Sequence, residues 1–218
     1  MSLRVMLDTE IRELTESLIT MGTSIEKAID NTIRALLQQD VALAESVIKG
    51  DDYFDFLEIE IEKRAIAVIS TQQPVASDLR RIFSTIKIVT DMERIADHCC
   101  DISKITIALA DKQYVKPLVD IPKMAQLVKD MVRMTVDCFI EQDVIKARLI
   151  CASDDAIDDY YQLVIRDVTS MLREPDADVE QLLRILMIAK YFERMADHAT
   201  NIAEWVVYSV EGKHFAAQ

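Results

Sequence analysis

The chain has 218 residues, half of them apolar, but only three glycines and four prolines. So few helix breakers favour long helices and argue against a sheet protein, which needs a turn about every 8–12 residues. The net charge of −13 at pH 7 argues against nucleic acid or an anionic membrane surface as a partner and favours a basic partner or a metal cation.

Six helices are predicted from the positions of the breakers. They span about 5–38, 40–71, 76–110, 121–141, 143–172 and 177–210. The stretch 111–122 contains two prolines and no helical period, which is typical of a linker. We therefore predict an all-α protein of two tandem three-helix bundles, with residues 1–112 forming the first and 113–218 the second.

The two halves are similar in sequence. ERIADHCCDI at 93–102 recurs as ERMADHATNI at 193–202, with six of ten positions identical. A second block, rich in aspartate, begins at Asp40 and recurs in the same order from Asp143, and one proline separates the two blocks in each half. Two blocks in the same order indicate an internal duplication, with a pseudo-twofold relation between the bundles.

The third helix of each half carries apolar residues at heptad spacing, which is typical of near-antiparallel helices in a bundle. The helix predicted at 76–110 also carries a second apolar stripe, formed by Ile88, Met92, Ile95, Cys99 and Ile102. This stripe has two possible partners, the sister repeat or a second copy of the chain, and the sequence does not decide between them.

Two carboxylates, Glu93 and Glu193, interrupt the heptad stripes. An ionised carboxylate in an apolar seam loses several kcal/mol to desolvation unless it is paired, protonated or bound to metal. Each is followed at one and two helical turns by further oxygen-bearing side chains: Asp97 and Asp101 in the first half, Asp197 and Asn201 in the second.

In an antiparallel hairpin, residues at equal distances from the turn face each other. A turn centred on residue 74, which is a proline, places Asp51 opposite Asp97 and Asp55 opposite Glu93. A turn centred between residues 175 and 176, directly after a proline, repeats this arrangement in the second half: Asp154 opposite Asp197 and Asp158 opposite Glu193.

Carboxylates that converge in this way repel one another unless a cation lies between them. Hard oxygen ligands suit magnesium, manganese, calcium or iron, and suit zinc less well. The predicted metal ligands are Asp51, Asp55, Glu93, Asp97, Asp101, Asp154, Asp158, Glu193, Asp197 and Asn201. Glu58 and Glu62 follow Asp51 and Asp55 on the same side of the helix predicted at 40–71, but they have no acidic counterparts in the second half. We therefore assign them to a solvated acidic face.

The motifs DMERIADH and YFERMADH, together with QPVASDLRRI at 73–82 and HATNIAE at 198–204, resemble the PhoU family of phosphate-transport regulators over nearly the whole chain. The resemblance implies a cytoplasmic, non-enzymatic negative regulator of the phosphate-starvation response, which reaches the membrane only through its partners. The implied partners are the ATPase subunit of a high-affinity phosphate transporter and a sensor histidine kinase. The implied assembly is a homodimer, and the implied cofactor is a divalent or trivalent metal, including multinuclear iron, on the ExxxD pairs.

Two other functions compete with this interpretation. A carboxylate-bridged di-iron oxidase or ferroxidase needs Glu-x-x-His motifs, but Ala96 and Ala196 stand three residues after Glu93 and Glu193. A structural bundle that binds divalent metal is the second alternative, and no feature of the sequence excludes it. A phosphate-binding loop, a dinucleotide fingerprint and a nucleophile–base pair are not evident in the sequence, so we do not expect an enzyme.

Overall fold

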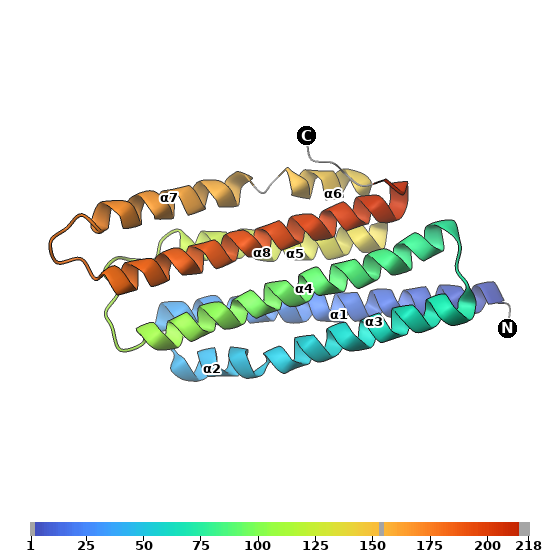
Figure 1. Ribbon diagram of the computed structural model, residues 1–218, viewed down its shortest axis with the longest axis horizontal. Helices are drawn as coiled ribbons and strands as arrows, with labels where there is room; N and C mark the ends of the chain where they lie inside the picture. Colours follow the sequence, from blue (N-terminus) through green and yellow to red (C-terminus); the bar gives the residue numbers. More distant parts are fainter. Residues whose placement is uncertain (1–2, 153–154, 214–218) are drawn as a thin grey trace.

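The structure is a computed structural model that describes residues 3–152 and 155–213 (Figure 1). Within these ranges the regular elements are all α-helices, which confirms the predicted fold class. In chain order they are α1 (Leu3–Gln38), α2 (Val41–Lys49), α3 (Asp51–Gln72), α4 (Ala76–Leu109), α5 (Ile121–Glu141), α6 (Val144–Cys151), α7 (Asp155–Met171) and α8 (Val179–Glu211).

The helices form two bundles in tandem, as predicted. Helices α4 and α8 pack against each other in the middle of the molecule; α1, α2 and α3 pack on α4, and α5, α6 and α7 pack on α8 (Figure 1). The segment between Leu109 and Ile121 connects the bundles, and the predicted boundary at residues 112 and 113 lies within it. No helix in the described part of the chain is both long and apolar enough to cross a membrane.

The helices predicted at 40–71 and 143–172 are each in two pieces, so the prediction of a single helix was wrong in both repeats. The break in the first repeat is at Gly50, whose N–H bonds the carbonyls of Ser46 and Val47 and ends α2. Glycine weakens a helix interior, and Asp51 and Asp52 favour a new helix start because they complement its dipole. In the second repeat α6 ends at Cys151 and α7 begins at Asp155.

Both hairpin turns lie where the pairing of carboxylates requires them. Helices α3 and α4 are separated by residues 73–75, and Gln73 adopts the left-handed conformation that ends α3. Helices α7 and α8 are separated by residues 172–178, a segment centred on residue 175. The turn positions predicted from the register are therefore confirmed.

The second apolar stripe of α4 has a partner within the chain. Its members, Ile88, Met92, Ile95, Cys99 and Ile102, are all fully buried, and α8 is the helix most extensively packed against α4. The equivalent residues of α8 are buried as well: Ile188, Phe192, Met195, Ala199 and Ile202. The sister repeat therefore accounts for the stripe.

Candidate functional site

The first acidic row lies along the hairpin of α3 and α4. Asp51 and Asp55 stand in the first two turns of α3, next to Asp97 and Glu93 of α4. Burial raises the pKa of Asp51; a hydrogen bond with the Cys100 thiol opposes the rise, and the charges of Asp97 and Asp55 add to it. The structure therefore brings together the four carboxylates that the register predicts for this repeat.

Glu93 is the most deeply buried member of this row, with only 8% of its side chain exposed. Its Oε2 is buried without a hydrogen bond, although Arg94 Nε lies within ion-pair distance at 3.3 Å. Burial raises the pKa of Glu93 to about 7, and the charges of Asp97, Glu58 and Asp55 add to the shift, which Arg94 opposes. At neutral pH both the protonated and the ionised form of this carboxyl are therefore present. Arg94 does not fully offset the effects of burial and of the neighbouring carboxylates on the ionised form.

Glu58 continues this row, as the sequence spacing indicated, and it is half-buried, whereas the sequence analysis assigned it to a solvated acidic face. Its charge acts on Glu93, and burial raises its own pKa against the effect of a hydrogen bond with Thr90. The sequence signal was the helical spacing from Asp55 to Glu58, one turn apart. The missing acidic counterpart in the second half obscured that signal.

The second acidic row, on α7 and α8, contains Asp158, Glu193 and Asp197. Burial and the charge of Glu193 raise the pKa of both aspartates, and Lys190 opposes both shifts. Asp154, the fourth predicted member, lies outside the described residues. Glu193 Oε2 is buried without a hydrogen bond, but it forms an ion pair with Lys190.

The two rows differ in the charged side chains that they contain. Lys190 occupies the position equivalent to Thr90, and its ammonium group also lies over the ring of Tyr161, 5.4 Å from the centroid. Tyr161 in turn occupies the position equivalent to Glu58. The first row therefore has an additional carboxylate, whereas the second row has a lysine that already neutralises part of its charge.

The fifth predicted metal ligand of each repeat, Asp101 or Asn201, contacts residues outside the acidic rows. Asp101 pairs with Lys104 Nζ at 3.2 Å and lies 3.7 Å from Nδ1 of His98. Asn201 donates from Nδ2 to Oδ1 of Asp91, on the other repeat, at 3.3 Å. The structure does not bring Asp101 or Asn201 into the contacts that hold the acidic rows.

A polar group joins the repeats where α4 and α8 pack together. His198 Nδ1 lies 2.8 Å from Asp91 Oδ1, and the ring of His98 stacks on Tyr191 with centroids 5.2 Å apart. His98 is buried and neither ring nitrogen forms a hydrogen bond; burial lowers its pKa, Arg194 and His198 lower it further, and the charge of Asp101 opposes the shift. Sequence reasoning missed Asp91 and Tyr191, because nothing in one helix shows which residues face the other repeat.

The donor set of the acidic rows fits a hard cation, because each row offers carboxylate oxygens, one of them buried without a hydrogen bond. Among the described residues, however, no three histidine, cysteine, aspartate or glutamate side chains are arranged as a ready metal site. The carboxylates are spread along each hairpin instead. A metal ion in either row would be held by the carboxylate side chains of that row.

Two tandem bundles, joined through one long helix of each and carrying an acidic row on each hairpin, define an internally duplicated helical-bundle protein. The chain belongs to the PhoU family, since the model of the PhoU domain matches it twice, over residues 18–106 and 121–206. The two matches correspond to the two bundles.

Curated relatives and solved structures agree with this assignment. The chain is 37% identical to a phosphate-specific transport system accessory protein PhoU homolog of Clostridium acetobutylicum, over 96% of each chain. It is 40% identical to the homolog of Aquifex aeolicus, over 94% of this chain and 92% of that protein. The crystal structure of PhoU from Pseudomonas aeruginosa superposes with a TM-score of 0.89 at 31% identity, covering 94% of this chain and 99% of that one.

Proposed function

We propose that this chain is an accessory regulatory protein of a phosphate-specific transport system and a negative regulator of the phosphate-starvation response. The observation that carries the proposal is similarity, over nearly the full length of both chains, to proteins named as phosphate-specific transport system accessory protein PhoU homologs. A crystal structure described as the phosphate transport system regulatory protein PhoU from Streptococcus pneumoniae adds support, with a TM-score of 0.91 over 97% of this chain at 26% identity.

In this proposal the protein acts in the cytoplasm, as an adaptor rather than an enzyme. Its partners are the ATPase subunit of the transporter and a sensor histidine kinase, and it works as a homodimer. Large apolar side chains stand exposed on outer helices, such as Phe56 on α3 and Ile145 on α6, which are 57% and 74% exposed. Single exposed apolar residues are normal on a protein surface, so the docking role rests on the similarity to the relatives and not on these side chains.

Deletion of the gene tests the regulatory role. Phosphate-starvation genes should be derepressed in phosphate-rich medium, and the wild-type gene supplied on a plasmid should restore repression. Co-purification from phosphate-replete cells tests the adaptor role and should recover the transporter ATPase or the kinase. Unchanged reporter expression in the deletion strain would overturn the proposal.

We also propose that the acidic rows bind metal, with Asp51, Asp55, Glu93 and Asp97 as the principal ligands of the first. The support is the buried Oε2 of Glu93 and the mutual repulsion of the carboxylates around it. Elemental analysis of protein purified without an affinity tag should find iron or another hard cation. Protein that contains no metal and gains none on incubation with ferrous iron, manganese or magnesium would refute this. Oxygen-dependent oxidation of added iron would instead favour the oxidase.

A further inference from the structure

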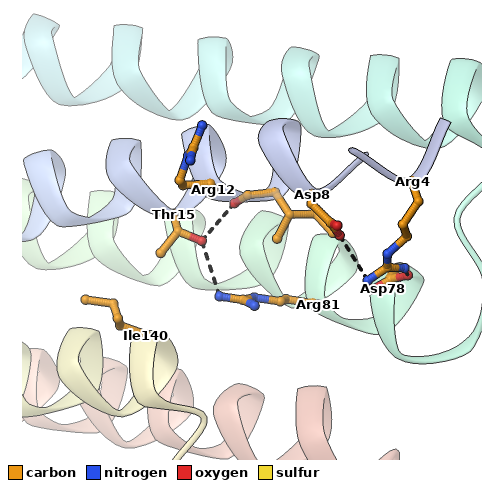
Figure 2. A pocket seen from close by; sticks show the side chains of 8 residues that line it. Arg4, Asp8, Arg12, Thr15, Asp78, Arg81 and Ile140 are labelled. Atoms are coloured by element: carbon orange, nitrogen blue, oxygen red, sulfur yellow. Dashed lines mark hydrogen bonds and ion pairs between the residues drawn. The ribbon is translucent and has the colours of Figure 1, made fainter. Parts of the chain in front are cut away.

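Arg81 lines a cavity of about 340 Å³ between the N-terminal half of α1, α4 and the end of α5 (Figure 2). Thr15 and Ile11 of α1 line the same cavity, and Ile140 closes it from α5. A charged side chain therefore faces open space that is partly enclosed by apolar residues. This cavity is separate from the acidic rows.

The guanidinium of Arg81 has few partners. Its Nη2 lies 3.5 Å from Oγ1 of Thr15, its Cζ lies 5.6 Å from the centroid of the Phe139 ring, and its Nε is buried without a hydrogen bond. Among the described residues, no carboxylate lies within 4.0 Å of it. The cation is thus half-buried without an ion pair, and its pKa is lowered by burial, against the attraction of Asp78.

The two carboxylates of the cavity are already engaged by another arginine. Arg4 Nη1 donates to Asp78 Oδ2 at 2.5 Å, and Arg4 Nη2 lies 2.9 Å from Asp8 Oδ1 (Figure 2). Arg12 stands at the rim with 69% of its side chain exposed. Arg12 in turn lies 3.9 Å from Glu16, so of the three guanidinium groups that line the cavity Arg81 alone has no described carboxylate within 4.0 Å.

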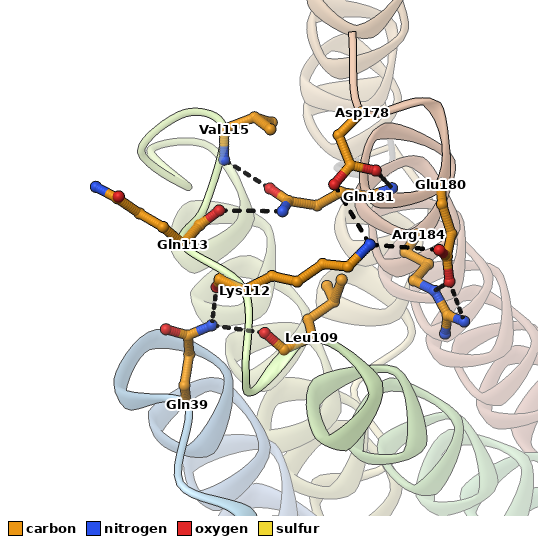
Figure 3. Close-up of polar contacts among 9 residues, drawn as sticks. All are labelled: Gln39, Leu109, Lys112, Gln113, Val115, Asp178, Glu180, Gln181 and Arg184. Carbon is orange, nitrogen blue, oxygen red and sulfur yellow. Dashed lines mark hydrogen bonds and ion pairs between the residues drawn. The ribbon is translucent and has the colours of Figure 1, made fainter.

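The second repeat shows that the fold itself does not need this charge. Gln181 is equivalent to Arg81, because ERMADH follows ERIADH at an offset of 100 residues. Its buried side chain accepts from the backbone N–H of Val115 at 2.6 Å and donates to the carbonyl of Gln113 at 3.1 Å (Figure 3). A neutral side chain satisfied by the linker thus fills the position that, in the first repeat, holds an unpaired cation beside a cavity.

We propose that this cavity binds a small tetrahedral oxyanion of the phosphate class, with Arg81 as its principal cation. The planar guanidinium offers two parallel N–H donors that match adjacent oxygens of such an anion. Partial burial strengthens the attraction because water screens it less. Arg12 at the rim is exposed and only loosely paired with Glu16, at 3.9 Å, so it can turn toward the anion and add a second positive charge. The anion is inorganic phosphate or a phosphate group carried by a larger molecule.

Isothermal titration calorimetry on the full chain tests the site, with inorganic phosphate, O-phosphoserine and sodium acetate as probes. Phosphate should bind, and Arg81→Gln, which copies the second repeat, should weaken binding at least tenfold. Arg184→Gln, which alters an arginine of α8 that is paired with Glu180, should bind as the wild type does. Tighter binding of inorganic phosphate than of phosphoserine identifies the free ion as the ligand, and the reverse identifies a phosphate ester.

Two further variants keep the test decisive if Arg81→Gln folds poorly. Asp78→Asn should strengthen phosphate binding severalfold, because it removes a nearby negative charge and releases Arg4. The Glu93→Gln, Glu193→Gln double variant should bind phosphate as the wild type does, which separates this site from phosphate held on metal at the acidic rows. Absence of binding at millimolar phosphate, equal affinity for acetate, or binding that none of the cavity variants changes would overturn the proposal.

Discussion

Nδ1 of His198 lies 2.8 Å from Oδ1 of Asp91, so a hydrogen bond crosses between the two repeats where α4 and α8 pack together. Asn201 donates to the same oxygen at 3.3 Å, and the Asp91 side chain is only 15% exposed. Asp91 thus accepts from two residues of the sister repeat, and no other described carboxylate takes part in this contact.

Asp91→Ala should lower the free energy of unfolding by about 1–2 kcal/mol, because it leaves Nδ1 of the part-buried His198 without an acceptor, whereas the exposed amide of Asn201 can bond to water. Urea denaturation followed by circular dichroism measures the effect. Asp130→Ala removes an ion pair with Arg133 on the surface of α5 and should change stability by less than about 0.5 kcal/mol. Equal effects of the two substitutions would show that the contact between the repeats contributes nothing of its own.

Gln181 ties the linker to the start of α8, and its removal should loosen the linker. Gln181→Ala leaves the N–H of Val115 and the carbonyl of Gln113 unpaired, so we expect a loss of about 1–3 kcal/mol in stability. Faster proteolytic cleavage within residues 110–120 should accompany the loss. Gln126→Ala, on an exposed face of α5, is the control, and cleavage at the same rate in both variants would contradict the prediction.

The sequence predicted the helices and their pairing well because both depend on local signals. Few breakers interrupt the chain, and a duplicated motif sets the register around Pro74 without knowledge of any contact. The breaks near Gly50 and after Cys151 were missed because apolar periodicity continues across both. Helix α3 restarts one residue after α2 ends and keeps nearly the same face toward the core, so its pattern resembles that of a continuous helix.

The candidate site was predicted less completely because its members are defined by packing between helices. Counting turns along one helix placed Asp101 with Glu93, but Asp101 pairs with Lys104 instead. Glu58 was set aside because the second repeat lacks it, yet it lies close enough to Glu93 to affect its pKa. Comparison of the two halves identifies the residues that they share, but it does not identify residues such as Glu58 that occur in one half only.

The pH dependence of stability should report the buried carboxyl of Glu93. Its pKa is raised from the usual 4.5 to about 7 in the folded chain, so between these values the folded state holds a proton that the unfolded state releases. The free energy of unfolding of metal-free protein should therefore fall as pH rises from about 4.5 to 7, by on the order of 1–3 kcal/mol from this group.

Glu93→Gln should remove that part of the slope and stabilise metal-free protein at pH 7 relative to the wild type. Thermal unfolding at several pH values, with the wild type and the variant compared at each, isolates the contribution of this carboxyl. Glu60→Gln, at an exposed ion pair on α3, serves as the control. A constant difference between wild type and Glu93→Gln from pH 4.5 to 7.5 would show that the carboxyl titrates normally.

The two acidic rows should differ in their affinity for metal, and Lys190 provides the structural reason. The ammonium of Lys190 pairs with Glu193, whereas the first repeat has Thr90 at that position and adds the carboxylate of Glu58. A cation already present in the row weakens the attraction for another, and an additional carboxylate strengthens it. The first row should therefore fill first in a metal titration and lose metal last when a chelator is added.

Substitutions that exchange Lys190 and Thr90 should change the order in which the two rows bind metal. Lys190→Thr should raise the affinity of the second row, and Thr90→Lys should lower that of the first, each by about tenfold, which corresponds to about 1.4 kcal/mol. Calorimetric titration with manganese, and the rise in melting temperature that the metal produces, measure both rows, since a ligand bound only by the folded chain stabilises it. Asp101→Asn and Asn201→Asp provide the comparison, because both residues are engaged outside the rows and should change metal affinity less. If the substitutions at 101 and 201 have the larger effect, the fifth position joins the ligands when metal binds, and the charge of Lys190 is not what separates the two rows.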